Sequence, residues 1–333
     1  MMEERKTGRI EYLDTARAYL ILMVVLGHVL IVLNPHYDRL LLTAAQEFMS
    51  SFYMSGFFII HGILLSNKSS INVPPWKTVL TARVRTMLVP YLFFEIVGLI
   101  FRWVLYGQPL PTGFYNLVTV RCNVGADWFL PALFMGNLLY TFWGMRQKSV
   151  VQAVSVCAGI TLAMLLPGGQ AGTILGRGLL AYSFITLGGL ARGLFLWDKL
   201  VGLVPGAVSL TVTALCGIIN LKWGGNDFYS CTVGNPLTLL LAGISGTCLV
   251  LFIARRFSCG LLRKAGAQTL IIMGTHQLVI YAMTAWFSAM RGGSILWGLV
   301  LLTSILVFEG PVVYILNRFF PLLLGRKRKN PVP

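Results

Sequence analysis

Long apolar runs recur along this chain, separated by short polar segments. Most runs have about 17 to 25 residues, the length with which an α-helix crosses the hydrocarbon core of a bilayer. This pattern predicts ten membrane-spanning helices. They are Ala16–Leu33, Phe48–Leu65, Met87–Tyr106, Trp128–Gly144, Val150–Leu166, Leu175–Leu196, Leu200–Ile219, Pro236–Ala254, Gln268–Met290 and Ile295–Asn317.

The composition supports this interpretation. Apolar residues make up 56% of the 333-residue chain and charged residues only 11%, whereas soluble domains carry about 25% charged residues. We therefore expect an all-α fold, a polytopic membrane protein with about ten transmembrane helices that form a single domain over residues 1–333.

The positive charges are distributed unevenly between the two predicted faces. With ten spans, the termini and the even-numbered loops lie on one face and carry 20 of the 27 Lys and Arg residues. The opposite face carries six, and Arg17 lies inside the first span. Because cytoplasmic loops are enriched in Lys and Arg, we expect both termini in the cytoplasm and the chain in the plasma (inner) membrane. This asymmetry explains the net charge of +16 without nucleic-acid binding.

The connections between the runs are short. Ser66–Thr86 is the longest predicted cytoplasmic connection, Gly107–Asp127 and Lys222–Asn235 are the main predicted external loops, and the basic tail Gly325–Pro333 is typical of a cytoplasmic anchor at anionic headgroups. The six cysteines lack metal-ligand spacing, so no metal is expected. Cys122 and Cys231 both fall in external loops, where the compartment permits a disulfide; the sequence leaves their pairing open.

Three polar side chains share one face of the first predicted span. Arg17 and His28 are eleven residues apart, and eleven steps of about 100° come to roughly 20° past three full turns. Asp14 precedes Arg17 by three residues, a spacing at which a carboxylate and a guanidinium pair on a helix. The rise of about 1.5 Å per residue places the imidazole roughly 16 Å beyond the guanidinium, about half the hydrocarbon thickness.

An ionisable ring at that depth has two interpretations. Ionisable groups inside a membrane are costly and commonly mark a functional site. The structural alternative is an interfacial Asp14–Arg17 ion pair, with His28 hydrogen-bonded to a neighbouring helix. The shared face and the depth favour the functional interpretation.

The first span resembles the opening helix of membrane-bound acyltransferase family 3, the multi-span O-acyltransferases that modify glycans. The family's hallmark is an arginine, ten intervening residues and a histidine, preceded by an aspartate, and Asp14, Arg17 and His28 match it. The most similar branch is the short, fucose 4-O-acetylase-like one. Further blocks that resemble the family follow in its order: Phe52–Gly62, Arg83-Val84-Arg85 with Pro90-Tyr91, Trp128–Phe134, and Gly266–Leu270 leading to His276.

The chain departs from the family pattern at two of these blocks. Tyr53, Ser55 and His61 stand where the second block usually has His, Pro and Ser. One residue separates Arg83 from Arg85, where many members have two.

The resemblance implies an O-acyltransferase with acetyl-CoA as the donor. The acceptor would be a hydroxyl of a surface or secreted glycan, or of a lipid-linked saccharide. His28 would act as general base or carry the acyl group transiently, since neutral imidazole does either near pH 7. Arg17, Arg83 and Arg85 would bind the phosphates of the donor, and Asp14 would hold Arg17 in place. The alternative for Arg83 and Arg85 is the positive-inside bias alone.

Other polar residues are secondary candidates. His276, Glu95 and Glu309 lie inside predicted spans and are expected either to support the reactive histidine or to form structural contacts. His61 either approaches the cytoplasmic arginines or caps its helix. External aromatic, amide and carboxylate side chains fit contacts with a sugar acceptor, although interfacial Trp and Tyr are also ordinary belt residues. They are Asp127, Trp128, Trp223, Asn226, Asp227 and Tyr229.

Two functions from other classes compete with the enzyme. A transporter or flippase of a lipid-linked sugar would use the same polar stripe to line a path, although no paired broken spans are present to support it. A non-catalytic partner in a glycan-assembly complex is the third. The sequence leaves open the acceptor sugar, the acyl chain length and whether the chain forms a homodimer.

Overall fold

The computed structural model describes residues 10–66, 75–166, 168–195 and 202–326. Helices account for nearly all of its regular structure. The helical elements are α1 (Glu11–Leu33), α2 (Leu40–Ser50), α3 (Tyr53–Ser66), α4 (Trp76–Arg83), the π-helix η1 (Val84–Leu88), α5 (Val89–Tyr106), α6 (Leu110–Val118), α7 (Phe129–Phe142), the 3₁₀ turn η2 (Gly144–Arg146), α8 (Ser149–Leu165), α9 (Gln170–Leu190), α10 (Arg192–Phe195), α11 (Leu203–Trp223), α12 (Pro236–Arg256), α13 (Gly260–Ala267), α14 (Thr269–Trp286), the 3₁₀ turn η4 (Ser288–Met290) and α15 (Ile295–Phe319). The strands β1 (Asn226–Asp227) and β2 (Thr232–Val233) form one short antiparallel hairpin.

Each predicted apolar run contains a helix. Seven helical segments in the described part of the chain are long and apolar enough to cross a membrane. The other three runs contain α7, α8 and α14, with 14, 17 and 18 residues. The predicted all-α membrane fold is confirmed, whereas the count of ten spans and the cytoplasmic position of the termini stay predictions.

Two helical segments begin earlier than the apolar pattern predicts. The connection Ser66–Thr86 is helical from Trp76 onward, and α4, η1 and α5 form one segment that ends at Tyr106. This part was missed because α4 is polar and basic, so that only the proline before it marks a helix start. The second span likewise begins at Leu40 and is interrupted after Ser50.

Some sequence predictions fall outside the described residues. These are Arg5, Lys6, Arg9, Lys68 and Lys199, which were counted among the basic residues of the predicted cytoplasmic face, and the tail from residue 327 to residue 333. Arg326, the last described residue, donates to the side-chain oxygens of Asn317 and Gln268.

Small residues let the central helices approach one another closely, as is common between membrane helices. A Cβ atom at Gly62 on α3 would overlap the carbonyl of Ile185 on α9, and one at Gly188 on α9 would overlap the carbonyl of Ile59. The backbones of α3 and α9 are therefore in contact. Around this crossing lies the largest apolar core, which includes the fully buried rings of Phe52, Phe58 and Phe184.

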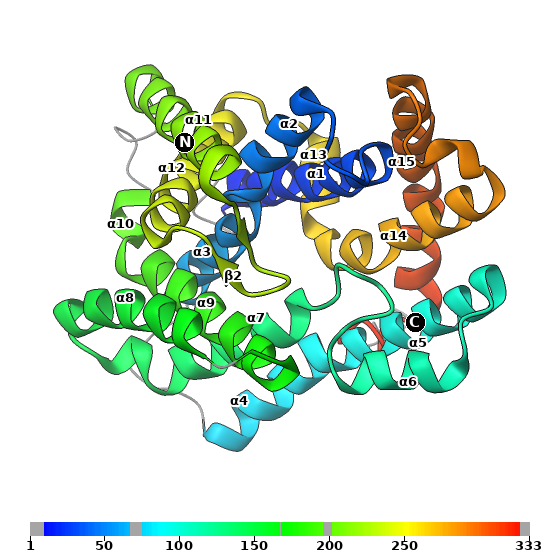
Figure 1. Ribbon diagram of the computed structural model, residues 1–333. Helices are drawn as coiled ribbons and strands as arrows, with labels where there is room; N and C mark the ends of the chain where they lie inside the picture. Colours follow the sequence, from blue (N-terminus) through cyan, green and yellow to red (C-terminus); the bar gives the residue numbers. More distant parts are fainter. Residues whose placement is uncertain (1–9, 67–74, 167, 196–201, 327–333) are drawn as a thin grey trace.

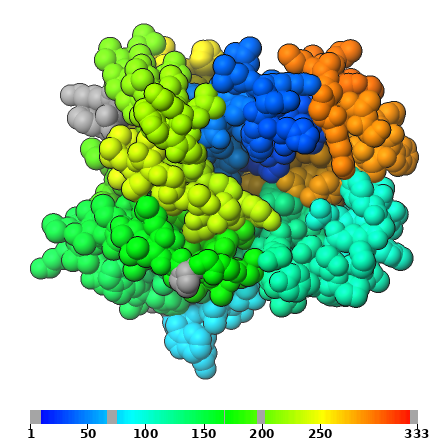
Figure 2. All heavy atoms as spheres, in the orientation of Figure 1, coloured from blue at the N-terminus to red at the C-terminus, as the bar shows by residue number. Residues whose placement is uncertain are grey.

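The loop between α6 and α7 and the loop between α11 and α12 meet over the central helices. The hairpin of β1 and β2 reaches the middle of the view, between α1 and α7 (Figure 1). In the all-atom view, this yellow-green segment meets the blue segment of α1 and α2 and the teal segment near α6 (Figure 2). Arg177, buried on α9, joins the two loops by donating to the carbonyls of Tyr229 and Val120. Cys122 and Cys231, one in each loop, are free thiols.

Candidate functional site

The polar stripe of α1 faces α14. A guanidinium nitrogen of Arg17 donates to the hydroxyl of Thr269 at 2.7 Å, and the Nδ1 atom of His28 lies 3.2 Å from Nε2 of His276. The two contacts lie on one side of α1, as the eleven-residue spacing predicts. On α14 the two partners are seven residues apart, which is about two turns. The two helices therefore run alongside each other between the two contacts.

For neutral imidazole rings, the hydrogen-bond contacts of His28 and His276 assign which nitrogen carries the proton. Nδ1 of His28 is 2.9 Å from the carbonyl of Val24, and Nδ1 of His276 is 2.6 Å from the carbonyl of Ile272. Carbonyls only accept, so each Nδ1 carries a hydrogen. Nε2 of His276 is then an acceptor for the Nδ1 hydrogen of His28. Nε2 of His28 keeps its lone pair as a proton acceptor.

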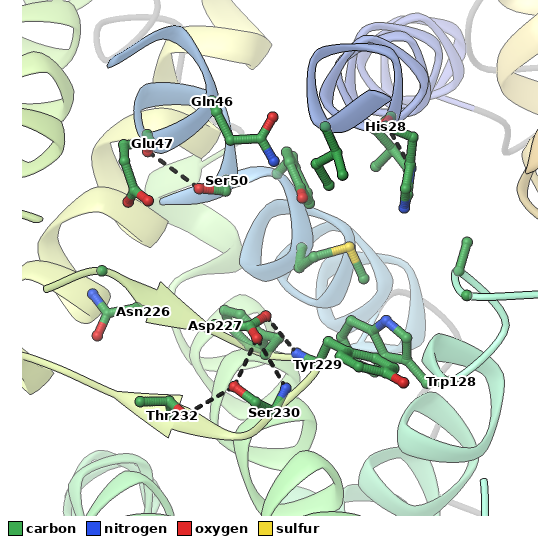
Figure 3. A pocket seen from close by; sticks show the side chains of 18 of the residues that line it. His28, Gln46, Glu47, Ser50, Trp128, Asn226, Asp227, Tyr229, Ser230 and Thr232 are labelled. Atoms are coloured by element: carbon green, nitrogen blue, oxygen red, sulfur yellow. Dashed lines mark hydrogen bonds between the residues drawn. The ribbon is translucent and has the colours of Figure 1, made fainter. Parts of the chain in front are cut away.

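His28 lines a cavity of about 580 Å³, which we call the His28 cavity. Its ring projects from α1 toward the space above Trp128, opposite the hairpin residues Asp227 and Ser230 (Figure 3). The wall combines side chains from α1, α2, α3, α14 and the two loops. The residues that line it are Val24, His28, Ile31, Tyr37, Gln46, Glu47, Ser50, Tyr53, Met54, Gly125, Ala126, Trp128, Gly225, Asn226, Asp227, Phe228, Tyr229, Ser230, Thr232, Met273 and Gln277.

Polar side chains of this cavity carry negative but no permanent positive charge. Glu47 and Asp227 are both among the lining residues, and none of those residues is a Lys or Arg. Asp227 is held by its own turn, where its carboxylate accepts from the backbone N–H groups of Tyr229 and Ser230. Gln46 is nine-tenths buried, and its Oε1 atom has no hydrogen-bond partner in the described part of the chain.

A second cavity, of about 320 Å³, lies next to Arg17, and we call it the Arg17 cavity. Arg83, which precedes the π-helix, and His61 from α3 also line it. Nε2 of His61 lies 2.6 Å from the amide nitrogen of Asn137. The full lining is Arg17, Phe57, Ile60, His61, Leu64, Arg83, Thr86, Met87, Phe129, Leu130, Leu133, Thr269, Leu270 and Met273.

Asp14 and Arg17 form the ion pair that their spacing predicts. The carboxylate lies 3.6 Å from the guanidinium. Helix α13 packs directly over this turn, because a Cβ atom at Gly266 would overlap the carbonyl of Asp14. The close approach of α13 brings the start of α14, and with it Thr269, to Arg17.

The two buried glutamates bind neither imidazole among the described residues. Glu95 accepts from the backbone N–H groups of Asn123 and Val124, at 2.6 and 3.0 Å, and so holds the loop before α7. Glu309 accepts from the hydroxyl of Thr275, the neighbour of His276. Their contacts are structural, and neither glutamate orients a histidine by direct contact.

Three other predicted residues are not brought into the cavities. Arg85 is the second residue of the π-helix η1 and lines a separate surface hollow with Lys77. Trp223 is exposed and is not among the residues lining the His28 cavity. Asp127 is fully buried behind the cavity wall, and neither carboxylate oxygen has a partner among the described residues. Burial, followed by the charge of Glu95, raises the pKa of Asp127 well above its usual range.

Several residues at the His28 cavity escaped the sequence analysis. Glu47 and Gln46 lie on α2, which precedes the second apolar run, and Gln277 follows His276 on α14. Tyr53 had one signal, since it replaces a histidine of the family block, and its hydroxyl lies close to Gly27, the neighbour of His28. The other residues carry no pattern of their own and were found only from the packing.

A family model matches most of the chain. The model of acyltransferase family 3, described as "Acyltransferase domain", matches residues 10–314. No curated protein and no solved structure matches the chain. All residues that line the His28 and Arg17 cavities lie within the matched region.

Proposed function

Since the chain belongs to acyltransferase family 3, whose model covers residues 10–314, we propose that it is an integral membrane O-acetyltransferase that moves an acetyl group from acetyl-CoA to a glycan hydroxyl. Acyltransfer is the activity of the family; the donor, the acceptor and the acetyl group are the proposal. The plasma membrane and cytoplasmic termini are proposed with it from the distribution of Lys and Arg.

In this proposal the donor binds at the Arg17 cavity. Guanidinium groups suit phosphates because they offer parallel N–H donors, and Arg17 and Arg83 both line this space. The Nε atom of Arg83 is buried and has no hydrogen-bond partner among the described residues. Arg85 lines another hollow, and the proposal therefore rests on Arg17 and Arg83.

In this proposal the acceptor binds at the His28 cavity. Sugar sites commonly combine hydroxyl, amide and carboxylate groups with an aromatic ring, and this wall offers Glu47, Gln277, Tyr53 and Trp128. Because the lining residues include two carboxylates and no Lys or Arg, an acidic saccharide would be repelled. We therefore propose a neutral or amine-bearing saccharide, either free or lipid-linked.

The arrangement of protons suits His28 for base catalysis. Nε2 takes the proton of the acceptor hydroxyl while the new O–C bond forms and the C–S bond of the thioester breaks. The proton then passes to the sulfur of the leaving CoA. The Nδ1 hydrogen bonds to Val24 and His276 stabilise the imidazolium that exists between these events. In the alternative mechanism with a covalent intermediate, Nε2 first attacks the thioester carbonyl and displaces the CoA thiolate, and the acetyl group then moves from Nε2 to the acceptor hydroxyl.

The observation that carries the proposal is that His28 lines a cavity while its Nδ1 atom contacts the carbonyl of Val24 and Nε2 of His276, which in the neutral ring leaves Nε2 as the proton acceptor. The test uses the purified full chain in nanodiscs, with radiolabelled acetyl-CoA and a panel of neutral methyl glycosides. We expect labelled glycoside from the wild type and a loss of about 10²-fold or more for His28→Ala.

His36→Ala is the matched control, because His36 is an exposed loop histidine outside both cavities. It should keep wild-type transfer. A transporter would give no acetylated glycoside with any of the three proteins, and full activity of His28→Ala would refute the assigned role of this ring.

A further inference from the structure

The two cavities adjoin at Met273, and we call the side chains between them the wall; four helical segments contribute residues to both cavities. Along each of these helices the lining residues change from the Arg17 cavity to the His28 cavity. On α1 the change falls between Arg17 and Val24, on α3 between Phe57 and Met54, and at the start of α7 between Phe129 and Trp128. On α14 it falls at a single residue, Met273, which lines both cavities.

Met273 lies between the two polar contacts that join α1 and α14. Thr269, the partner of Arg17, precedes it by four residues, and His276, the partner of His28, follows it by three. At about 1.5 Å per residue it lies roughly 6 Å from the level of Thr269 and 4.5 Å from that of His276. An acyl group that passes from Arg17 toward His28 along this pair of helices must therefore pass Met273.

The other side chains of the wall are less able to move. Phe57 and Phe129 pack ring to ring at 5.7 Å, and Trp128 meets Phe129 edge to face at 6.4 Å. Their rings fill fixed positions in a close-packed core. Methionine is unbranched, and its side-chain bonds rotate, so it adapts its shape at modest cost. Met273 is 4% exposed, so its side chain is packed between the two cavities that it lines.

We propose that Met273 is the residue that selects the length of the acyl chain. This inference rests on the proposed function, with the thioester at the Arg17 cavity and the acceptor hydroxyl at the His28 cavity. In the transfer step the acceptor O–C bond forms, the thioester C–S bond breaks, and the hydroxyl proton passes through His28 to the leaving thiol. The acyl group must be at the wall when this happens, beside the Met273 side chain, so the space there limits its length.

Replacing Met273 by alanine removes Cγ, Sδ and Cε, which is more than the space that the two extra carbons of a butyryl group need. We expect Met273→Ala to raise the ratio of kcat/KM for butyryl-CoA to that for acetyl-CoA by about tenfold or more, the size of discrimination that methylene groups produce in apolar pockets. Met273→Leu keeps the side-chain volume, and such a replacement is tolerated in cores. The leucine side chain is shorter than that of methionine. It should fold like the wild type and shift the ratio in the same direction by less.

The assay measures CoA release from acetyl-, propionyl- and butyryl-CoA by the full chain in nanodiscs, with the neutral methyl glycoside panel present. Met290→Ala is the matched control, because it removes the same atoms from a buried methionine that lines neither cavity. Its ratio should equal that of the wild type, even if its stability falls as much as that of Met273→Ala.

The outcomes separate this inference from the proposed function. If the wild type transfers acetyl groups but Met273→Ala and Met273→Leu keep its butyryl-to-acetyl ratio within twofold, Met273 does not select the acyl chain and the proposed function stands. An equal rise in the ratio for Met290→Ala would also overturn the inference, since it would reflect loosened packing. If the wild type releases CoA from none of the thioesters, both proposals fail.

Discussion

At the scale of single residues, the contact between His28 and His276 determines which nitrogen of the site is free. His276 gives its Nδ1 hydrogen to the carbonyl of Ile272 and turns Nε2 toward Nδ1 of His28. It lines neither cavity. We therefore regard His276 as a positioning residue that acts through His28.

Removing this positioning group should slow the chemical step more than donor binding. We expect His276→Ala to lower kcat by about 10- to 100-fold, the range found when hydrogen-bond partners of metal-bound histidines are removed, and to leave KM for acetyl-CoA within about twofold. His276→Gln should recover part of kcat, because its amide oxygen also accepts a hydrogen bond. A KM effect without a kcat effect would show that His276 serves the donor site instead.

Asp127 contributes to the fold in a way that depends on pH. It is fully buried without a partner among the described residues, and burial raises the pKa of its carboxyl well above the usual range. Above about pH 4, the usual pKa of aspartate, the unfolded chain releases this proton while the folded chain still holds it. The unfolded state then binds fewer protons, so stability falls as pH rises until the folded-state pKa is reached.

Asp127→Asn removes this titration. We expect the variant to gain stability relative to the wild type as pH rises from 5 to 8, by up to about 1.4 kcal/mol per pH unit while the folded carboxyl stays protonated. Unfolding in detergent, measured at several pH values, provides the comparison. A stability difference that stays constant over this range would show that Asp127 has no raised pKa.

At the scale of elements, the approach of α13 to α1 positions the Arg17 end of the site. Gly266 lies against the backbone of Asp14, and the following turn delivers Thr269 to Arg17. Gly260, at the start of the same helix, has open space around it. The two glycines therefore separate the effect of packing from that of helix propensity.

Gly266→Ala should push α13 away from α1. We expect a loss of about 1–3 kcal/mol of stability, typical of overpacking, together with a raised KM for acetyl-CoA because Arg17 loses its partner. Gly260→Ala should change the stability by no more than the usual surface effect of about 0.5 kcal/mol. It should leave KM for acetyl-CoA unchanged. Thermal unfolding and donor titration test both variants, and equal behaviour of the two would contradict this role for α13.

Sequence patterns predicted elements better than they predicted the wall of the site. Helical periodicity is local, so the shared face of Arg17 and His28 followed from their spacing alone. The family blocks also pointed to His61 and Arg83, which line the Arg17 cavity. The positions of Glu47 and Gln277 at the cavity, and of Met273 between the two cavities, depend on how distant helices pack, and no local pattern encodes that. The polar α4 was missed for a related reason, since hydropathy detects lipid contact and not helicity.

At the scale of the whole molecule, the structure places its basic and its acidic cavity in sequence along α1. The Arg17 cavity has the guanidinium groups, and the His28 cavity has the carboxylates, with Met273 between them. The rise from Arg17 to His28 is roughly 16 Å, about half the hydrocarbon thickness. Donor and acceptor would then enter from opposite faces, and only the acetyl group would cross.

The most direct test of this account measures transfer across a sealed membrane. Proteoliposomes would enclose radiolabelled acetyl-CoA, with the methyl glycoside that the wild type acetylates best supplied only outside. We predict labelled glycoside outside with CoA retained inside, and none with His28→Ala. Acetylation that requires donor and acceptor on the same face, and that fails when the membrane separates them, would contradict the account.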